Sequence, residues 1–173
     1  MNFPLCPRFQ AVLFDMDGTL LDTLSDMQDA VNHILLENGW PQRTLEEIRA
    51  FVGNGAAKLM ERAIPEPIAP QRFQEILSTY KDWYQAHNCV KTAPYPGIPE
   101  VLAELEKMGV KTAVVSNKPD ATTKALAEKF FPGMPALGQR DGVDPKPSPA
   151  LVAQALSDFG VRPENAVYVG DSE

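Results

Sequence analysis

The stretch "AVLFDMDGTLLDT", residues 11–23, places two acids directly after an apolar segment. Ala11 to Phe14 are all apolar, which is typical of a strand covered on both faces in a parallel sheet. Asp15 and Asp17 follow this segment, one residue apart. Two like charges this close repel each other and are costly to remove from water. The stretch therefore predicts a buried strand whose end holds something that compensates two carboxylates.

The length and charge of the chain limit the classes of protein to which it can belong. A chain of 173 residues with 44% hydrophobic content can bury a core, as one domain or as a domain with an insert. Its 16 Lys and Arg against 23 Asp and Glu give a net charge of -7. This argues against nucleic acid or an anionic membrane as the main partner, because both select for basic surfaces. A small anionic ligand is still compatible with this charge, because a local pocket can be positive on an acidic protein.

Cysteine usage and hydropathy indicate the compartment. Cys6 and Cys89 lie far apart and lack metal-ligand spacing, which favours free thiols in a reducing environment. The sequence shows neither the apolar segment of a signal peptide nor one long enough to cross a bilayer. We therefore expect a cytoplasmic protein, a monomer or homodimer, that binds neither nucleic acid nor membrane.

The hydrophobic periodicity changes along the chain. From 24 to 88 it is helical throughout, with a capping box at Thr44–Glu47 and a break at Gly53-Asn54-Gly55. After the stiff segment 94–97, helical and strand patterns alternate, which is typical of a parallel sheet. The predicted strands are 11–14, 111–116 and 166–169. The predicted helices of this part are one through Val101 and Met108 that Gly109 caps, one over 121–130 and one over 148–159.

These patterns predict an α/β fold with two parts. Residues 1–21 and 95–173 form a Rossmann-like parallel-sheet core, and residues 22–94 form an α-helical cap domain inserted after the first strand.

Polar residues follow each predicted strand of the core. Asp15 and Asp17 follow the first strand, Ser116-Asn117-Lys118 the second and Gly170-Asp171-Ser172 the third, while Lys146 lies in the loop "DPKPSP". In open parallel sheets, ligands bind outside the carboxyl ends of the strands. We therefore expect these acids, the hydroxyl, the amide and the lysine to gather into one site.

The motifs "DMDGT", "SN", "KPSP" and "GDSE", in this order, resemble the four motifs of the haloacid dehalogenase-like superfamily. The resemblance covers essentially the whole chain and is greatest to phosphatases that carry a helical cap after the first motif. It implies that Asp15 is a nucleophile that forms an aspartyl-phosphate. It also implies that Asp17, in its protonated form, protonates the leaving alcohol and then activates the hydrolytic water.

The same resemblance implies a Mg²⁺ cofactor and a phosphate-binding loop. The ligands would be the Asp15 carboxylate, the backbone carbonyl of Asp17 and the Asp171 carboxylate, which suits the preference of Mg²⁺ for hard oxygen donors. The phosphate-binding side chains would be those of Ser116 and Asn117, and Lys146 would supply a second positive charge. Gly18 would let the backbone approach the phosphate closely, with Thr19 beside it as a further binding residue.

The segment "FVGNGAAK", residues 51–58, resembles the cap segment of phosphoglycolate phosphatases. Its turn could direct backbone amides, the Asn54 side chain or Lys58 toward a substrate carboxylate. The resemblance therefore implies hydrolysis of a small anionic phosphate ester, in particular 2-phosphoglycolate to glycolate and phosphate.

Simpler interpretations of the same residues exist. Asp15 and Asp17 are also compatible with a solvated turn, Lys146 with an exposed loop, and Ser116-Asn117 with helix capping. Residues 51–58 are also compatible with a plain corner between two helices.

Several rival functions share the four motifs. A dehalogenase has no use for a second acid at Asp17, but a β-phosphoglucomutase-like phosphotransferase differs mainly in the cap, and a phosphonate hydrolase would use a lysine such as Lys58 in a Schiff base. The chain also stops at Glu173, whereas family members continue with a further acid, helix and strand. The resemblance thus implies either a truncated or a shortened chain, and a catalytically incomplete binding or structural relative is a further alternative.

Overall fold

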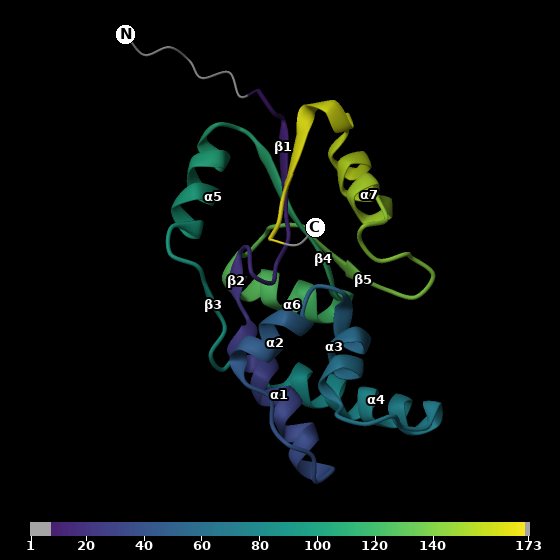
Figure 1. The fold of residues 1–173 in the computed structure, drawn as a ribbon. Helices are drawn as coiled ribbons and strands as arrows, with labels where there is room; N and C mark the ends of the chain where they lie inside the picture. The colour runs from purple at the N-terminus through teal and green to yellow at the C-terminus, as the bar shows by residue number, and fades with distance from the viewer. Residues whose placement is uncertain (1–7, 172–173) are drawn as a thin grey trace. The chain divides into compact units, whose positions relative to one another are not determined.

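The structure is a computed structural model that describes residues 8–171. The chain folds into two compact units, Met1–Leu21 with Pro94–Glu173, and Asp22–Ala93. The first contains the parallel sheet and is called the sheet unit below, and the second is called the helical unit (Figure 1). The fold class is α/β, as the alternation of strand and helix patterns predicts.

The sheet unit is built on four parallel strands in the order β5-β4-β1-β6. The strands are β1 (Ala11–Phe14), β4 (Lys111–Pro119), β5 (Ala136–Gln139) and β6 (Ala166–Val169). β1 pairs with β4 on one side and with β6 on the other, with Phe14 opposite Val114 and Val169. The carboxyl ends of the three predicted strands therefore lie side by side, which brings their following residues to one edge.

Helices cover the sheet on both sides, as expected for parallel strands. They are α5 (Ile98–Lys107), α6 (Asp120–Phe130) and α7 (Ala150–Phe159), with a 3₁₀ turn, η1 (Pro163–Asn165), before β6. Leu151, Ala155 and Leu156 of α7 pack against buried residues of β1 and β4. Figure 1 shows α5 on the opposite side of these strands from α7.

Two features of this unit differ from the sequence prediction. β4 runs on to Pro119, three residues beyond its predicted end, and β5 is a strand that was not predicted. β5 is short and contains Gly138, whose missing side chain is required by packing. A Cβ there would lie 2.5 Å from the Cα of Asp120. A tight approach between backbones therefore replaces the apolar side chains by which a strand is usually recognised.

The helical unit confirms the predicted all-helical segment. It contains α1 (Leu24–Glu37), α2 (Leu45–Phe51), α3 (Gly55–Ala63) and α4 (Pro70–His87). The capping box at the start of α2 forms as predicted between Thr44 and Glu47. Ile76, Leu77 and Tyr80 of α4 are buried in one apolar cluster with residues of α1, α2 and α3.

Two short strands, β2 (Leu21–Asp22) and β3 (Ala93–Pro94), pair at the points where the chain passes between its units. Within the part of the chain from 8 to 171, no helix has the length and apolar character needed to cross a membrane.

Candidate active site

The carboxylate of Asp15 lies directly after β1 and is almost fully buried, with 7% of the residue exposed. Its Oδ1 accepts a hydrogen bond from the backbone N–H of Met16 at 2.7 Å, and its Oδ2 lies 2.6 Å from Nζ of Lys146. Burial raises the pKa of Asp15, the Lys146 cation opposes this shift, and the charge of Asp17 adds to it. Asp15 is thus a desolvated carboxylate with one close cationic partner.

Lys146 reaches Asp15 from the loop between β5 and α7. Its Nζ also donates to the carbonyl oxygen of Val115 at 3.1 Å and to the hydroxyl of Tyr168. An ammonium group has three N–H donors, and three acceptors surround this one. The structure therefore brings the predicted lysine to the predicted nucleophile, and it adds Tyr168, which was not predicted from the sequence.

Asp17 has a cationic partner of its own. Nζ of Lys118, near the end of β4, lies 2.9 Å from Oδ1 and 3.0 Å from Oδ2 of Asp17. Only 6% of Lys118 is exposed. The sequence pattern places this lysine at a strand end but predicts no role for it. The available signal was a lysine near the end of an apolar strand, at the edge where the acids gather.

Ser116 and Asn117 lie at the same end of β4. Ser116 is 1% exposed, and its hydroxyl accepts a hydrogen bond from the backbone N–H of Lys118 at 3.2 Å. The Asn117 amide donates to the carbonyl oxygen of Lys146 at 3.0 Å and accepts from its N–H at 2.7 Å. The amide that the resemblance assigns to the phosphate is therefore engaged with the lysine loop in this structure.

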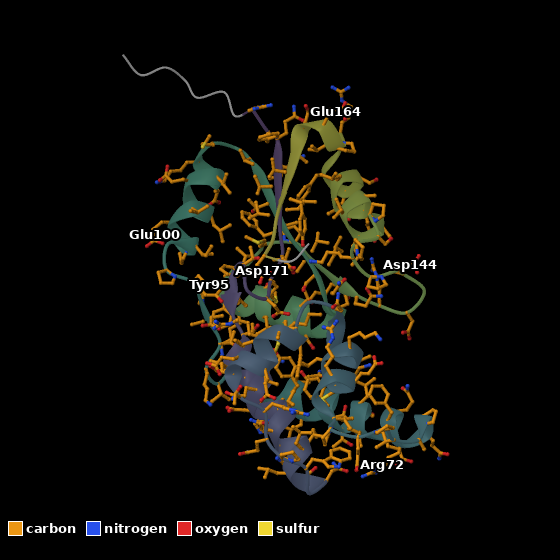
Figure 2. The ribbon with its side chains drawn as sticks, viewed as in Figure 1. Arg72, Tyr95, Glu100, Asp144, Glu164 and Asp171 are labelled. Carbon is orange, nitrogen blue, oxygen red and sulfur yellow. The ribbon has the colours of Figure 1, made fainter. Side chains whose placement is uncertain are left out.

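The loop after Asp17 meets the end of β6 at very short range. Gly18 has a φ of 75°, and a Cβ there would lie 2.1 Å from Oδ2 of Asp171. A side chain at Gly18 would collide with this carboxylate, which explains the glycine. Figure 2 shows Asp171 just beyond β6. The hydroxyl of Thr19, in the same loop, is buried and has no hydrogen-bond partner among the described residues.

The oxygen donors at this edge suit a hard divalent cation. Asp15 follows β1 and Asp171 follows its neighbour β6, and the N–H of Asp15 donates to the carbonyl of Val169 at 2.8 Å. Between residues 8 and 171, no group of three or more His, Cys, Asp or Glu side chains is placed to hold a metal ion. Mg²⁺ needs no such group, because it is bound through one or two carboxylates and keeps several waters. The residues present therefore fit Mg²⁺ better than a metal that requires His or Cys.

The two predicted recognition residues of the helical unit are exposed and engaged with their own helix. Asn54 precedes α3, and its Oδ1 accepts a hydrogen bond from Nη2 of Arg62 at 2.9 Å. Lys58 lies on α3 with its Nζ 2.6 Å from Glu61. Arg62 also donates to the carbonyl of Phe51 at 2.8 Å, so it joins the two ends of this turn. No role for Arg62 was predicted from the sequence.

Comparison with known proteins agrees with the resemblance. The family model of haloacid dehalogenase-like hydrolases matches residues 12–173. The phosphoglycolate phosphatase of Pseudomonas putida is 34% identical over 171 residues, a match that covers 93% of this chain and 62% of the relative. The N-acetylmuramic acid 6-phosphate phosphatase of Pseudomonas aeruginosa is 33% identical over 167 residues, covering 95% of this chain and 74% of the relative.

A solved structure gives the same result for the fold. That of a predicted phosphoglycolate phosphatase from Haemophilus somnus has a TM-score of 0.87 and 27% sequence identity, covering 95% of this chain and 78% of that chain. The chain spans about 62% of the length of the curated phosphoglycolate phosphatase from Pseudomonas putida.

Proposed function

The chain belongs to the haloacid dehalogenase-like hydrolase family, and on this premise we propose that it is a magnesium-dependent phosphatase of small phosphate monoesters. The proposed substrate is 2-phosphoglycolate and the products are glycolate and phosphate. The observation that carries the proposal is the pairing of a buried Asp15 with Lys146 at the carboxyl edge of the sheet. A nucleophilic carboxylate held beside a fixed cation is suited to accept a phosphoryl group, because the cation offsets the charge of the incoming phosphate.

The proposed reaction has two steps. A carboxylate oxygen of Asp15 bonds to phosphorus as the ester P–O bond breaks, and Asp17 gives its proton to the leaving alkoxide. Water, deprotonated by Asp17, then attacks the phosphorus of the aspartyl-phosphate and releases phosphate and the free Asp15. Nζ of Lys118 lies against both oxygens of Asp17 in this structure, so this contact has to open before Asp17 can carry the proton that the first step requires.

Asp15, Asp171 and the backbone carbonyl of Asp17 would hold Mg²⁺, which when bound would neutralise charge on the phosphoryl group. Lys146 supplies a positive charge at the same place, and the buried Ser116 hydroxyl and the Gly18–Thr19 backbone are proposed to bind phosphate oxygens.

We propose that the helical unit acts as the cap that recognises the leaving group, through Asn54 and Lys58. Support comes from the named activity of the Pseudomonas putida relative. The relative that acts on N-acetylmuramic acid 6-phosphate supports a sugar phosphate as the second candidate substrate.

Phosphate release by the 173-residue chain tests this function directly. The panel contains 2-phosphoglycolate, N-acetylmuramic acid 6-phosphate and glucose 1-phosphate, each with Mg²⁺ and with EDTA. Asp15→Asn is the active-site variant, and Asp158→Asn, the same change at an exposed position of α7, is the matched control. We expect metal-dependent release that Asp15→Asn abolishes and Asp158→Asn leaves unchanged.

Each other result has a defined meaning. Release that survives in Asp15→Asn contradicts the nucleophile, and no release from any ester by a folded chain contradicts a phosphatase activity of this chain. Conversion of glucose 1-phosphate to glucose 6-phosphate, followed by ³¹P NMR, would favour the phosphotransferase alternative. A preference for the sugar phosphates would replace 2-phosphoglycolate as the substrate.

A further inference from the structure

The lysine beside Asp15 is held at both of its ends, by two residues that form or break no bond in the proposed reaction. We infer that Asn117 and Tyr168 are positioning residues that fix Lys146 against Asp15. This inference rests on the proposed function insofar as it concerns catalysis, but the geometry on which it stands does not.

Asn117 fixes the backbone of Lys146. Its amide makes two hydrogen bonds to this one residue, at 3.0 Å to the carbonyl and at 2.7 Å from the N–H. The N–H and C=O of a residue in a β-sheet form the same pair of hydrogen bonds with the residue opposite it on a neighbouring strand. The side chain of Asn117 therefore ties the lysine loop to the end of β4, although residues 117 and 146 belong to different segments.

Tyr168 fixes the other end of the lysine. Its hydroxyl accepts a hydrogen bond from Nζ of Lys146 and donates one to the carbonyl of Val115 at 3.2 Å. The lysine Nζ also lies 5.0 Å from the centre of the Tyr168 ring, a cation–π distance.

Both contacts restrict the conformational freedom of the lysine side chain. Its four-carbon stem is flexible, and ordering it only when substrate binds would cost rotamer entropy in every turnover. A charge that is already in place when the phosphoryl group transfers stabilises the transition state without that reorganisation. Loss of either holder should therefore lower kcat more than it changes KM.

The activity test uses Asn117→Asp, Asn117→Ala and Tyr168→Phe, with Asn165→Ala as the matched control. Asn117→Asp keeps the acceptor for the N–H of Lys146 and loses the donor, while Tyr168→Phe keeps the ring and loses the hydroxyl. We expect kcat to fall about 10- to 100-fold in Asn117→Ala and less in the two conservative variants, with KM nearly constant. In a Lys146→Met background the same changes should cost almost nothing further, because residues that act as a unit are not additive.

Two results of this assay would overturn the inference. One is an undiminished kcat in all three variants. The other is a full loss that persists in the Lys146→Met background with a raised KM, which would show that Asn117 binds the substrate directly.

A second readout does not depend on turnover. Acetylation of lysines by acetic anhydride, followed by mass spectrometry, measures the reactivity of each amino group. An amino group engaged in close contacts reacts more slowly than an accessible one. The side chain of Lys146 is 13% exposed and that of Lys58 is 56% exposed, so Lys58 serves as the internal reference. We expect Lys146 to react faster in Tyr168→Phe and Asn117→Ala while Lys58 does not change.

The two readouts separate the two proposals. Faster acetylation of Lys146 in a chain that releases no phosphate would keep the positioning of Lys146 and contradict the phosphatase function. Equal acetylation of Lys146 in the wild type and both variants would overturn the positioning itself. Asn117→Asp keeps this test valid if Asn117→Ala fails to fold.

Discussion

The core of the helical unit and the carboxyl edge of the sheet are both buried, but the first consists of apolar side chains and the second of polar and charged ones. In the helical unit, apolar residues such as Ile34, Ile48 and Met60 fill a cluster at 0–1% exposure. At the sheet edge, Asp15, Ser116 and Lys118 are 1–7% exposed. The first kind of burial is driven by the hydrophobic effect, whereas the second is costly unless every charge and hydroxyl finds a partner.

The difference lies in where the partners come from. Each helix buries an apolar stripe against a neighbouring helix, and many similar apolar contacts each contribute a part of the stability. At the sheet edge, a few ion pairs compensate the cost of burying charge. They join residues from different segments, as Asp17 joins Lys118 and Asp15 joins Lys146. Replacing buried ion pairs with apolar residues is often neutral or stabilising. A fold that keeps two such pairs at one edge therefore points to chemistry rather than to stability.

The largest loss of stability is expected from a substitution at Lys118, which tests whether the sheet edge depends on individual ion pairs. Lys118→Met leaves the carboxylate of Asp17, only 18% exposed, without its lysine partner. We expect the free energy of unfolding to fall by about 3 kcal/mol, because removing one member of a buried pair leaves a desolvated charge behind. Urea unfolding followed by circular dichroism measures this.

The double variant Lys118→Met/Asp17→Leu is the control for this prediction. It should regain most of the lost stability, because no charge is left without its partner, while phosphate release stays absent. A double variant as unstable as the single one would show that Lys118 contributes packing rather than charge compensation.

A smaller effect is expected at Asp26, where the helical unit also buries a carboxylate. Asp26 of α1 is 1% exposed and accepts hydrogen bonds from the backbone N–H groups of Val90, Lys91 and Thr92 and from the Thr92 hydroxyl. Asp26→Asn turns an amide donor toward some of these donors, and we expect a loss of about 2 kcal/mol.

Asp29→Asn is the matched change on the same helix. The Asp29 side chain is 41% exposed, and surface changes of this kind stay within about 0.5 kcal/mol. Thermal unfolding of the two variants compares them. An equal loss at both positions would mean that the buried carboxylate contributes no more than a surface charge.

Structure that depends on near neighbours in the sequence could be predicted, and contacts between distant segments could not. The four helices of the helical unit and the strands β1 and β6 follow from local periodicity and capping, because each residue's environment depends on near neighbours. The site residues were placed at one edge by the rule for parallel strands. Their mutual contacts were not predicted, because the Lys118 and Tyr168 contacts depend on pairing between distant segments, and a position at a strand end does not show which side chain lies opposite. β5 was missed for the same reason, since Gly138 is selected by its distance to Asp120 rather than by strand propensity.

The smallest predicted effect concerns Asp120, which joins α6 to β5. Its carboxylate accepts from the N–H of Gly138 at 2.9 Å and lies 2.7 Å from Nζ of Lys124. Burial raises the pKa of Asp120, but the bonds from Lys124 and Gly138 outweigh it and hold the pKa below its ordinary value. The folded state therefore favours the ionised form. The resulting stability is present above the pKa of the unfolded chain and is lost as the pH falls through the lower pKa of the folded one.

Asp120→Asn should accordingly cost about 0.5–1 kcal/mol at pH 7 and less below about pH 4. Thermal unfolding of the variant and the wild type at neutral pH and in acid measures the difference. A gap that stays constant between these conditions would assign the loss to the altered hydrogen bond alone, because a proton-linked contribution has to shrink in acid. A gap that widens in acid would contradict the direction of the pKa shift. The size of the change therefore measures how much of the polar packing between α6 and β5 depends on charge.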